Sequence, residues 1–146
     1  MPSILHITAH LGGGAGNVLS SVACSAKKNA SPFRHEIMQL EPTDNMHYVN
    51  ICRKNNISLY LADEADIEDK INSADIVQIE WWHHPLTMKF MHDYLSLIPC
   101  RLVIWSHISG CKYPYIPAGF VQLPEKFIFT SPNSYENPLW SEENRD

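Results

Sequence analysis

The spacing of apolar side chains alternates between two patterns along the chain, and this alternation predicts the architecture. Short apolar runs predict six strands, at residues 4–8, 34–40, 57–61, 75–80, 102–105 and 126–130. Apolar positions three or four residues apart predict the intervening helices, at residues 16–29, 44–55, 65–73 and 84–95. Strands that alternate with helices form βαβ units, whose right-handed crossovers build a parallel sheet. We therefore expect an α/β fold, a Rossmann-like doubly wound parallel sheet of about six strands with helices on both faces.

Local residue signals set the expected ends of these elements. Asp44 is a candidate N-cap for the second helix, and Pro85 suits the first turn of the fourth. Residues 110–124 contain prolines and glycines without a clear period and predict a loop with one short helix. We expect one domain over residues 1–135. The polar residues 136–146 are expected to be a tail, the start of a further element.

Composition and charge narrow the classes of function. The chain has 146 residues and 45% hydrophobic residues, which is enough for one domain with its own core. Its net charge of −5 argues against a nucleic-acid partner. The sequence shows no secretory leader and no apolar run long enough to cross a bilayer, so we expect a cytoplasmic location. The basic residues around Lys27, Lys28 and Arg34 are expected to be solvated helix ends, with weak contact at the inner face of a membrane as the alternative.

Metal chemistry is not expected from the residue spacing. The four cysteines show no CxxC pair, and without an export signal they predict reduced thiols. The histidines form no zinc-motif array with the cysteines, and the adjacent His83 and His84 rarely share one metal. We therefore expect no metal and no bound cofactor.

A glycine cluster between the first strand and the first helix is the leading candidate for a binding loop. Four of the five residues from Gly12 to Gly16 are glycine, and such a turn lets backbone N–H groups approach an anionic ligand at a helix start. The dinucleotide fingerprint G-x-G-x-x-G fails, because its third glycine would fall on Asn17 or Leu19. No Gly-Lys pair exists for a P-loop. Glu41 follows the second strand, where a ribose-binding acid would lie, so a dinucleotide site stays open as an alternative, as does a purely structural tight turn.

Histidines follow two further strands of the predicted sheet. His83 and His84 come after the fourth strand and His107 after the fifth, so all three are expected at the carboxyl edge beside the glycines. Histidine there can donate a hydrogen bond to a sugar hydroxyl or a phosphate, or move a proton near neutral pH. Either Trp81 or Trp82 can stack on a sugar, and we expect the other in the core. Four further histidines are expected to be structural or on the surface: His6, His35, His47 and His92.

Several of these segments, in this order, resemble the N-terminal domain of the family-4 retaining glycosyltransferases of the GT-B fold. The resemblance covers residues 3–135 and rests on the order of the motifs more than on any single one. The matching segments are Ile4–Ile7 with Leu11–Val18, His35–Ile37, Asp75–Val77 with His83–Leu86, Val103–His107, and Phe127–Ser131.

The resemblance implies a function and a set of site residues. In this family the glycine loop lies at the donor phosphates and the acceptor, which implies Gly13, Gly14, Gly16 and Asn17 as binding residues. The histidine that matches His107 contacts the reacting sugar, which implies His107 as the catalytic residue. His83 and His84 are implied near the acceptor.

The implied reaction is transfer of a hexose from a UDP- or GDP-sugar to a glycan or lipid-linked acceptor, with retention at the anomeric carbon. The family binds the nucleotide mainly on a second, C-terminal domain with an E-x7-E pair, which this sequence lacks. We therefore expect the chain to be inactive alone. Two alternatives remain: a nucleotide- or dinucleotide-binding module without sugar transfer, and a non-enzymatic partner that completes a split transferase.

Overall fold

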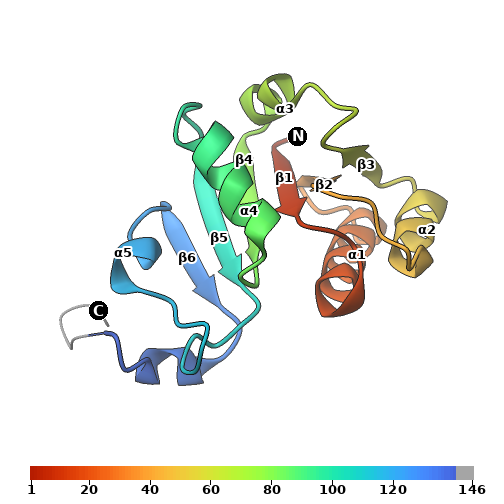
Figure 1. Cartoon of the computed structure of the whole chain (residues 1–146). Helices are drawn as coiled ribbons and strands as arrows, with labels where there is room; N and C mark the ends of the chain where they lie inside the picture. The colour runs from red at the N-terminus through yellow and green to blue at the C-terminus, as the bar shows by residue number, and fades with distance from the viewer. Residues whose placement is uncertain (141–146) are drawn as a thin grey trace.

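The computed structural model describes residues 1–140 and shows a six-stranded sheet between two layers of helices (Figure 1). The strands are β1 (Ser3–Thr8), β2 (Arg34–Gln39), β3 (Ser58–Leu61), β4 (Ile76–Trp81), β5 (Leu102–Ser106) and β6 (Lys126–Phe129). The helices are α1 (Gly13–Lys28), α2 (His47–Lys54), α3 (Ile67–Ser73), α4 (Pro85–Phe90) and α5 (Ala118–Val121). A π-helical turn, η1 (Met91–Leu95), continues α4, and a 3-10 helix, η2 (Pro132–Glu136), follows β6.

All neighbouring strands run parallel, in the order β3-β2-β1-β4-β5-β6. The chain builds outward from β1 to β3, returns to place β4 on the other side of β1, and then builds outward to β6. The strand order therefore reverses between β1 and β4, which is where open α/β sheets bind their ligands. The expected Rossmann-like parallel sheet of six strands is confirmed.

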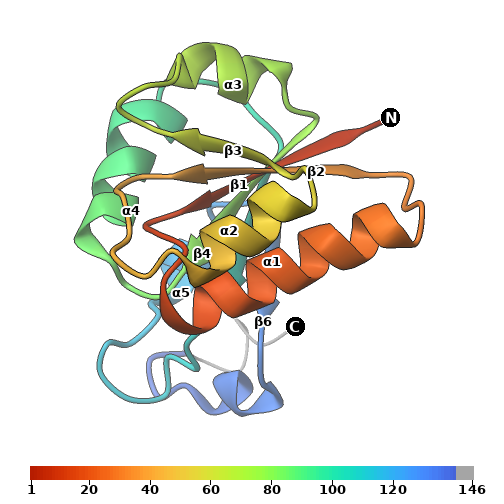
Figure 2. The ribbon, with the colours of Figure 1, turned by 90° about the vertical axis from the view of Figure 1, so that its right-hand side faces the viewer.

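The helices cover opposite faces of the sheet (Figure 2). A separate hydrophobic core holds the helices to each face. Side chains of a strand point alternately to the two faces, so Ile37 joins one core and its neighbour Met38 joins the other. The core that contains Ile37 packs against α1 and α2, whereas the core that contains Met38 packs against α3 and α4. Odd and even positions of a strand therefore lie on opposite faces of the sheet. Polar side chains of neighbouring strands can meet only where they lie on the same face.

The helix starts differ from the sequence expectation at two places. The first helix begins at Gly13 and not at residue 16, so that three glycines lie in its first turns. Asp44 is not the cap of the second helix, because α2 begins at His47 with Met46 at its N-cap position and no side-chain cap. Pro85 does occupy the first turn of α4, as expected.

The packed part of the chain continues past the expected boundary at residue 135. Asn137 and Trp140 are buried, and the side chains of both donate a hydrogen bond to the backbone carbonyl of Ile116 at 2.8 Å. These contacts join the tail to the loop before α5, so residues up to Trp140 belong to the domain. The rest of the expected tail, residues 141–146, lies outside the described residues.

No helix among residues 1–140 is both long and apolar enough to cross a bilayer. The four cysteines are free thiols, as expected. Cys52 lies on the buried face of α2, and this burial raises the pKa of its thiol to about 11. The thiol at this position is therefore protonated and unreactive at neutral pH.

Candidate functional site

A cavity of about 500 Å³ opens at the carboxyl edge of the sheet, near the point where the strand order reverses. Its walls come from the segments that follow four different strands, β1, β4, β5 and β6. The lining residues are His10, Gly12, Gly13, Gly14, Ala15, Val18, Trp82, His107 and Thr130. The structure thus brings the glycine loop and the predicted histidine His107 into one site.

Gly13 and Gly14 form the open wall of this cavity. A Cβ atom added to either glycine would have no other atom within 4 Å, so nothing in the fold requires a glycine there for space. Gly13 has φ +63°, which disfavours other residues. The N-cap of α1 is Gly12, which supplies no side-chain cap, so first-turn N–H groups of the helix remain for a ligand.

Gly16 and Asn17, in contrast, do not belong to the cavity. Gly16 is buried, and a Cβ atom there would approach the backbone oxygen of Leu11 to 2.1 Å. This glycine lets α1 pass close to the chain that leaves β1, so its role is packing and the prediction of ligand contact is not supported. Asn17 is exposed on α1 outside the lining of the cavity.

The two adjacent histidines separate in the structure. His83 is exposed with φ +67°, and its ring contacts the rings of Trp81 and Tyr113 outside the cavity. Its prediction as a binding residue is therefore not supported. His84 is the N-cap of α4 and lies within 5.9 Å of His10, measured between ring centroids, so it borders the cavity through that residue.

His107 is held in place by two hydrogen bonds. Its backbone N–H donates to the carbonyl of Trp81 at 2.8 Å, which continues the pairing of β5 with β4. Its ring Nε2 lies 2.6 Å from Oε2 of Glu80, a side chain with no exposed surface. A carboxylate only accepts hydrogen bonds, so Nε2 of His107 carries the hydrogen.

Glu80 receives two further hydrogen bonds. The amide nitrogen of Gln78 donates to its Oε1 at 2.8 Å, and Nδ1 of the buried His6 lies 2.8 Å from the same oxygen. Burial by itself would raise the pKa of Glu80, but the hydrogen bonds from His107 and His6 outweigh it, and the net pKa lies below the ordinary value. The carboxylate is therefore ionised and fully satisfied inside the sheet.

The polar row continues from His6 to His35 on the next strand. Nε2 of His6 lies 2.8 Å from Nδ1 of His35, and the two rings stack. Burial, with a smaller contribution from His6, lowers the pKa of His35. His35, His6, Glu80 and His107 thus form one hydrogen-bonded chain across β2, β1, β4 and the end of β5.

The hydrogen-bonded row of His35, His6, Glu80 and His107 was not predicted from the sequence, although the strand pattern contains a signal for it. In each strand the polar residue alternates with core residues on the opposite face, as His6 does between Leu5 and Ile7 and Glu80 does between Ile79 and Trp81. A buried glutamate in an otherwise apolar strand is rare unless it is paired. A buried glutamate together with histidines at strand positions on the same face of the sheet indicates such a row.

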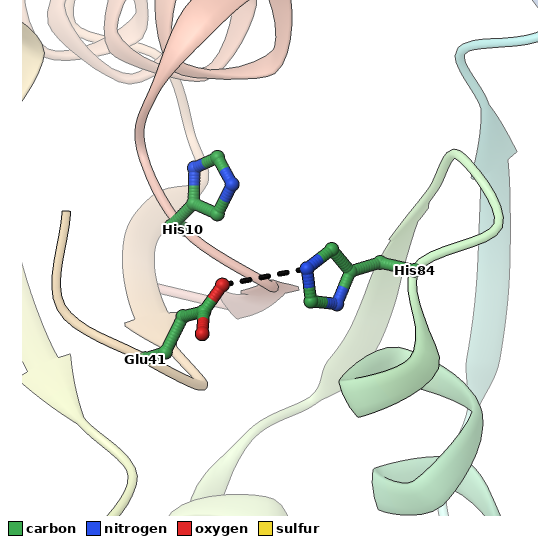
Figure 3. A group of neighbouring side chains, drawn as sticks. All are labelled: His10, Glu41 and His84. Atoms are coloured by element: carbon green, nitrogen blue, oxygen red, sulfur yellow. Dashed lines mark ion pairs between the residues drawn. The ribbon is translucent and has the colours of Figure 1, made fainter.

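A second cluster joins His10, Glu41 and His84 beside the cavity (Figure 3). One ligand-type atom from each residue lies within 4.8 Å of the others, and Nε2 of His84 is 3.3 Å from Oε1 of Glu41. This cluster was not anticipated, because the sequence spacing of its three residues follows no metal motif.

The ring hydrogen bonds show how this cluster is protonated. Nδ1 of His10 accepts from the backbone N–H of Gly12 at 3.0 Å, and Nδ1 of His84 accepts from that of Leu86 at 3.2 Å. Each neutral ring then carries its hydrogen on Nε2, whereas a metal bound at Nε2 needs the hydrogen on Nδ1. An Nε2 atom that carries a hydrogen has no lone pair for a metal, so these ring hydrogen bonds disfavour metal coordination.

Comparison with known proteins gives no relative: no protein-family model, no curated protein and no solved structure matches this chain. The fold and the site define its class as a Rossmann-like parallel α/β domain with a ligand-sized cavity at the switch point of the sheet.

Proposed function

We propose that this chain is the acceptor-side, N-terminal domain of a retaining GT-B glycosyltransferase. One observation carries the proposal: Gly13 and Gly14, which match the family's glycine loop, and His107, which matches its sugar-contacting histidine, line the same cavity. The two segments are more than 90 residues apart in the sequence, and the parallel topology places both at one edge of the sheet, where they line one cavity. The parallel sheet in which they meet is the architecture that this class requires.

The chemistry of the cavity suits a sugar. Trp82 is half-buried in its wall and offers an aromatic surface for the apolar face of a sugar ring, while Trp81 is in the core. His10, His107 and Thr130 bring polar atoms that hydroxyl groups can use, and the glycine loop brings backbone N–H groups for a phosphate. Apolar stacking combined with several convergent polar groups is the usual composition of a specific ligand pocket.

The proposed reaction moves a hexose from a UDP- or GDP-sugar to a glycan or lipid-linked acceptor, with His107 as the catalytic residue. Most nucleotide contacts in this class belong to a second domain, so the proposed partner is that domain. The proposed setting is the cytoplasm. Lys27, Lys28 and Lys54 border one surface hollow at the ends of α1 and α2, which supports weak contact with an anionic membrane.

A second candidate, a dinucleotide-binding module, is favoured by the strand order. The order β3-β2-β1-β4-β5-β6 is that of dinucleotide-binding sheets, and Glu41 follows β2 where a ribose-binding acid lies. Two observations weigh against it. The glycine fingerprint fails, and the carboxylate of Glu41 is already paired with His84 at 3.3 Å.

Calorimetric titration of the chain with NAD⁺, UDP and GDP, followed by incubation with UDP- and GDP-sugars, separates the two candidates. For an isolated acceptor-side domain we expect no sugar transfer, because reactant positioning, which contributes roughly 7–11 kcal/mol, needs both walls of the site. We also expect no nucleotide binding at micromolar concentration, because most nucleotide contacts in this class belong to the second domain. Micromolar binding of NAD⁺ would support the dinucleotide module. Sugar transfer by the isolated chain would mean a single-domain enzyme.

A further inference from the structure

The hydrogen-bonded chain from His35 to His107 determines which atom of His107 meets a ligand. Glu80 occupies Nε2 of His107, and the other ring nitrogen, Nδ1, has no hydrogen bond with any residue in the described part of the chain. The ring of Trp105 packs beside that of His107 at 4.9 Å between centroids, and His107 lines the cavity. Nδ1 is therefore the atom of His107 that remains for a ligand.

The row behind Glu80 fixes the position of the carboxylate. Oε1 accepts from both Gln78 and His6, so only Oε2 is left for His107. A carboxylate with three donors and no exposed surface cannot rotate without leaving a buried group unsatisfied, which costs about 1–3 kcal/mol per group. The orientation of His107 is thus set by residues on β1 and β4, out of reach of any ligand.

We infer that Glu80 is the positioning residue of this site, which holds His107 in the Nε2–H tautomer so that Nδ1 accepts a hydrogen from a ligand hydroxyl. This inference rests on the proposed function for the identity of the hydroxyl, that of a sugar. Glu80 itself touches no ligand and acts only through His107. A histidine backed in this way by a carboxylate is suited to accept a proton from the group bound at its free nitrogen.

Replacing Glu80 by glutamine should change the tautomer of His107, because an amide has one oxygen that accepts and one NH₂ group that donates. Gln78 and His6 both donate to the Oε1 position, so the amide oxygen is expected there. The NH₂ group then faces His107 and donates to Nε2, which must offer a lone pair. Glu80→Gln should therefore convert His107 from the Nε2–H to the Nδ1–H tautomer and turn Nδ1 from an acceptor into a donor.

The test is nitrogen-15 NMR of the histidine rings in mildly alkaline solution, without ligand, since the long-range coupling pattern distinguishes the two tautomers. The His107 signals are assigned by their loss in His107→Asn. Glu41→Gln is the matched control, because it changes a glutamate that pairs with His84 and leaves Glu80 intact. Thermal unfolding of each variant shows whether its fold survives.

We expect His107 in the Nε2–H tautomer in the unsubstituted chain and in Glu41→Gln, and complete loss of that pattern in Glu80→Gln. The Nδ1–H tautomer, or an averaged mixture, in the unsubstituted chain would overturn the inference even if Glu80→Gln does not fold. An unchanged tautomer in a folded Glu80→Gln chain would also overturn it. Because no sugar is present, these outcomes are independent of whether the chain belongs to a glycosyltransferase.

Discussion

His107 and Glu80 come from neighbouring strands and share a hydrogen bond of 2.6 Å, between Nε2 of the imidazole and Oε2 of a carboxylate that no solvent reaches. One end of this pair lies in the core of the sheet and the other lines the cavity at its carboxyl edge. The pair therefore links the interior polar row to the place where a ligand would bind. It also explains why a histidine at this position keeps one fixed orientation in an otherwise open site.

Substitution of His107 should affect ligand chemistry far more than the fold, although the loss of one of the three donors to buried Glu80 costs about 1–3 kcal/mol of stability. His107 is partly exposed at the cavity, so His107→Ala removes no large part of the core. In a full-length transferase that contains this domain, we expect turnover to fall by about 10²–10⁴-fold, the usual contribution of a group that transfers or positions a proton. Steady-state kinetics checks this, with His92→Ala on the exposed surface of η1 as the control. Equal turnover in the two variants would place the site elsewhere.

Gly14 and Gly16 should differ in how much stability their substitution by alanine costs. In Gly16→Ala the new Cβ meets the oxygen of Leu11, so the free energy of unfolding should fall by about 1–3 kcal/mol or more. In Gly14→Ala the new Cβ meets nothing, and the stability should be unchanged or rise by up to about 1 kcal/mol, since alanine favours a helix. Urea denaturation of both variants measures the difference. Equal destabilisation would show that the two glycines share one structural role.

Acid should destabilise the domain in two separate steps. In the folded chain the pKa of His35 lies below its ordinary value of 6.5. The contribution of neutral His35 to the free energy of unfolding is therefore complete above pH 6.5 and is lost as the pH falls through the lower pKa of the folded state. The folded pKa of Glu80 lies below 4.5, so its share is lost only at still lower pH. His35→Gln should therefore flatten the unfolding free energy between pH 6.5 and the onset of carboxylate protonation. Urea titrations at several pH values check this, and an unchanged acid slope in that window would assign it to another group.

Zinc should not bind tightly to the cluster of His10, Glu41 and His84. Coordination at both Nε2 atoms would transfer each hydrogen to Nδ1 and break the bonds from the backbone N–H groups of Gly12 and Leu86. Competition with a chelating dye should give a zinc affinity no better than that of a His10→Gln, His84→Gln double variant. Micromolar or tighter binding that the double variant loses would show that the rings reorient around a metal.

The sequence was sufficient for the sheet because the face of each strand is set locally. Alternation in β2 and β4 and helical spacing in α1 and α4 do not depend on distant residues, so the six strands and their parallel arrangement were predictable. The first residues of the helices were less predictable from the sequence. Asp44 has the chemistry of a cap, but α2 begins three residues later, and no local rule decides between nearby starts.

The site was predictable only in part, since it depends on register between strands. That His107 and the glycine loop share an edge follows from parallel topology. That Gly16 is a packing residue depends on how closely α1 passes Leu11, and that His83 leaves the cavity depends on its positive φ. Neither property can be inferred from residue types. The meeting of His6, Glu80 and His107 required the pairing of β1, β4 and β5 in one specific register.

Chemical-shift mapping on the isotope-labelled chain tests whether a sugar binds in the cavity lined by Gly13, Gly14, Trp82 and His107. Oligosaccharides of several sugar types are titrated to millimolar concentration, with NAD⁺ in a parallel series. We expect at least one oligosaccharide to shift the signals of these four residues, Trp82→Ala to abolish the shifts, and NAD⁺ to produce none. Shifts of the same four residues by NAD⁺ but by no oligosaccharide would contradict this expectation.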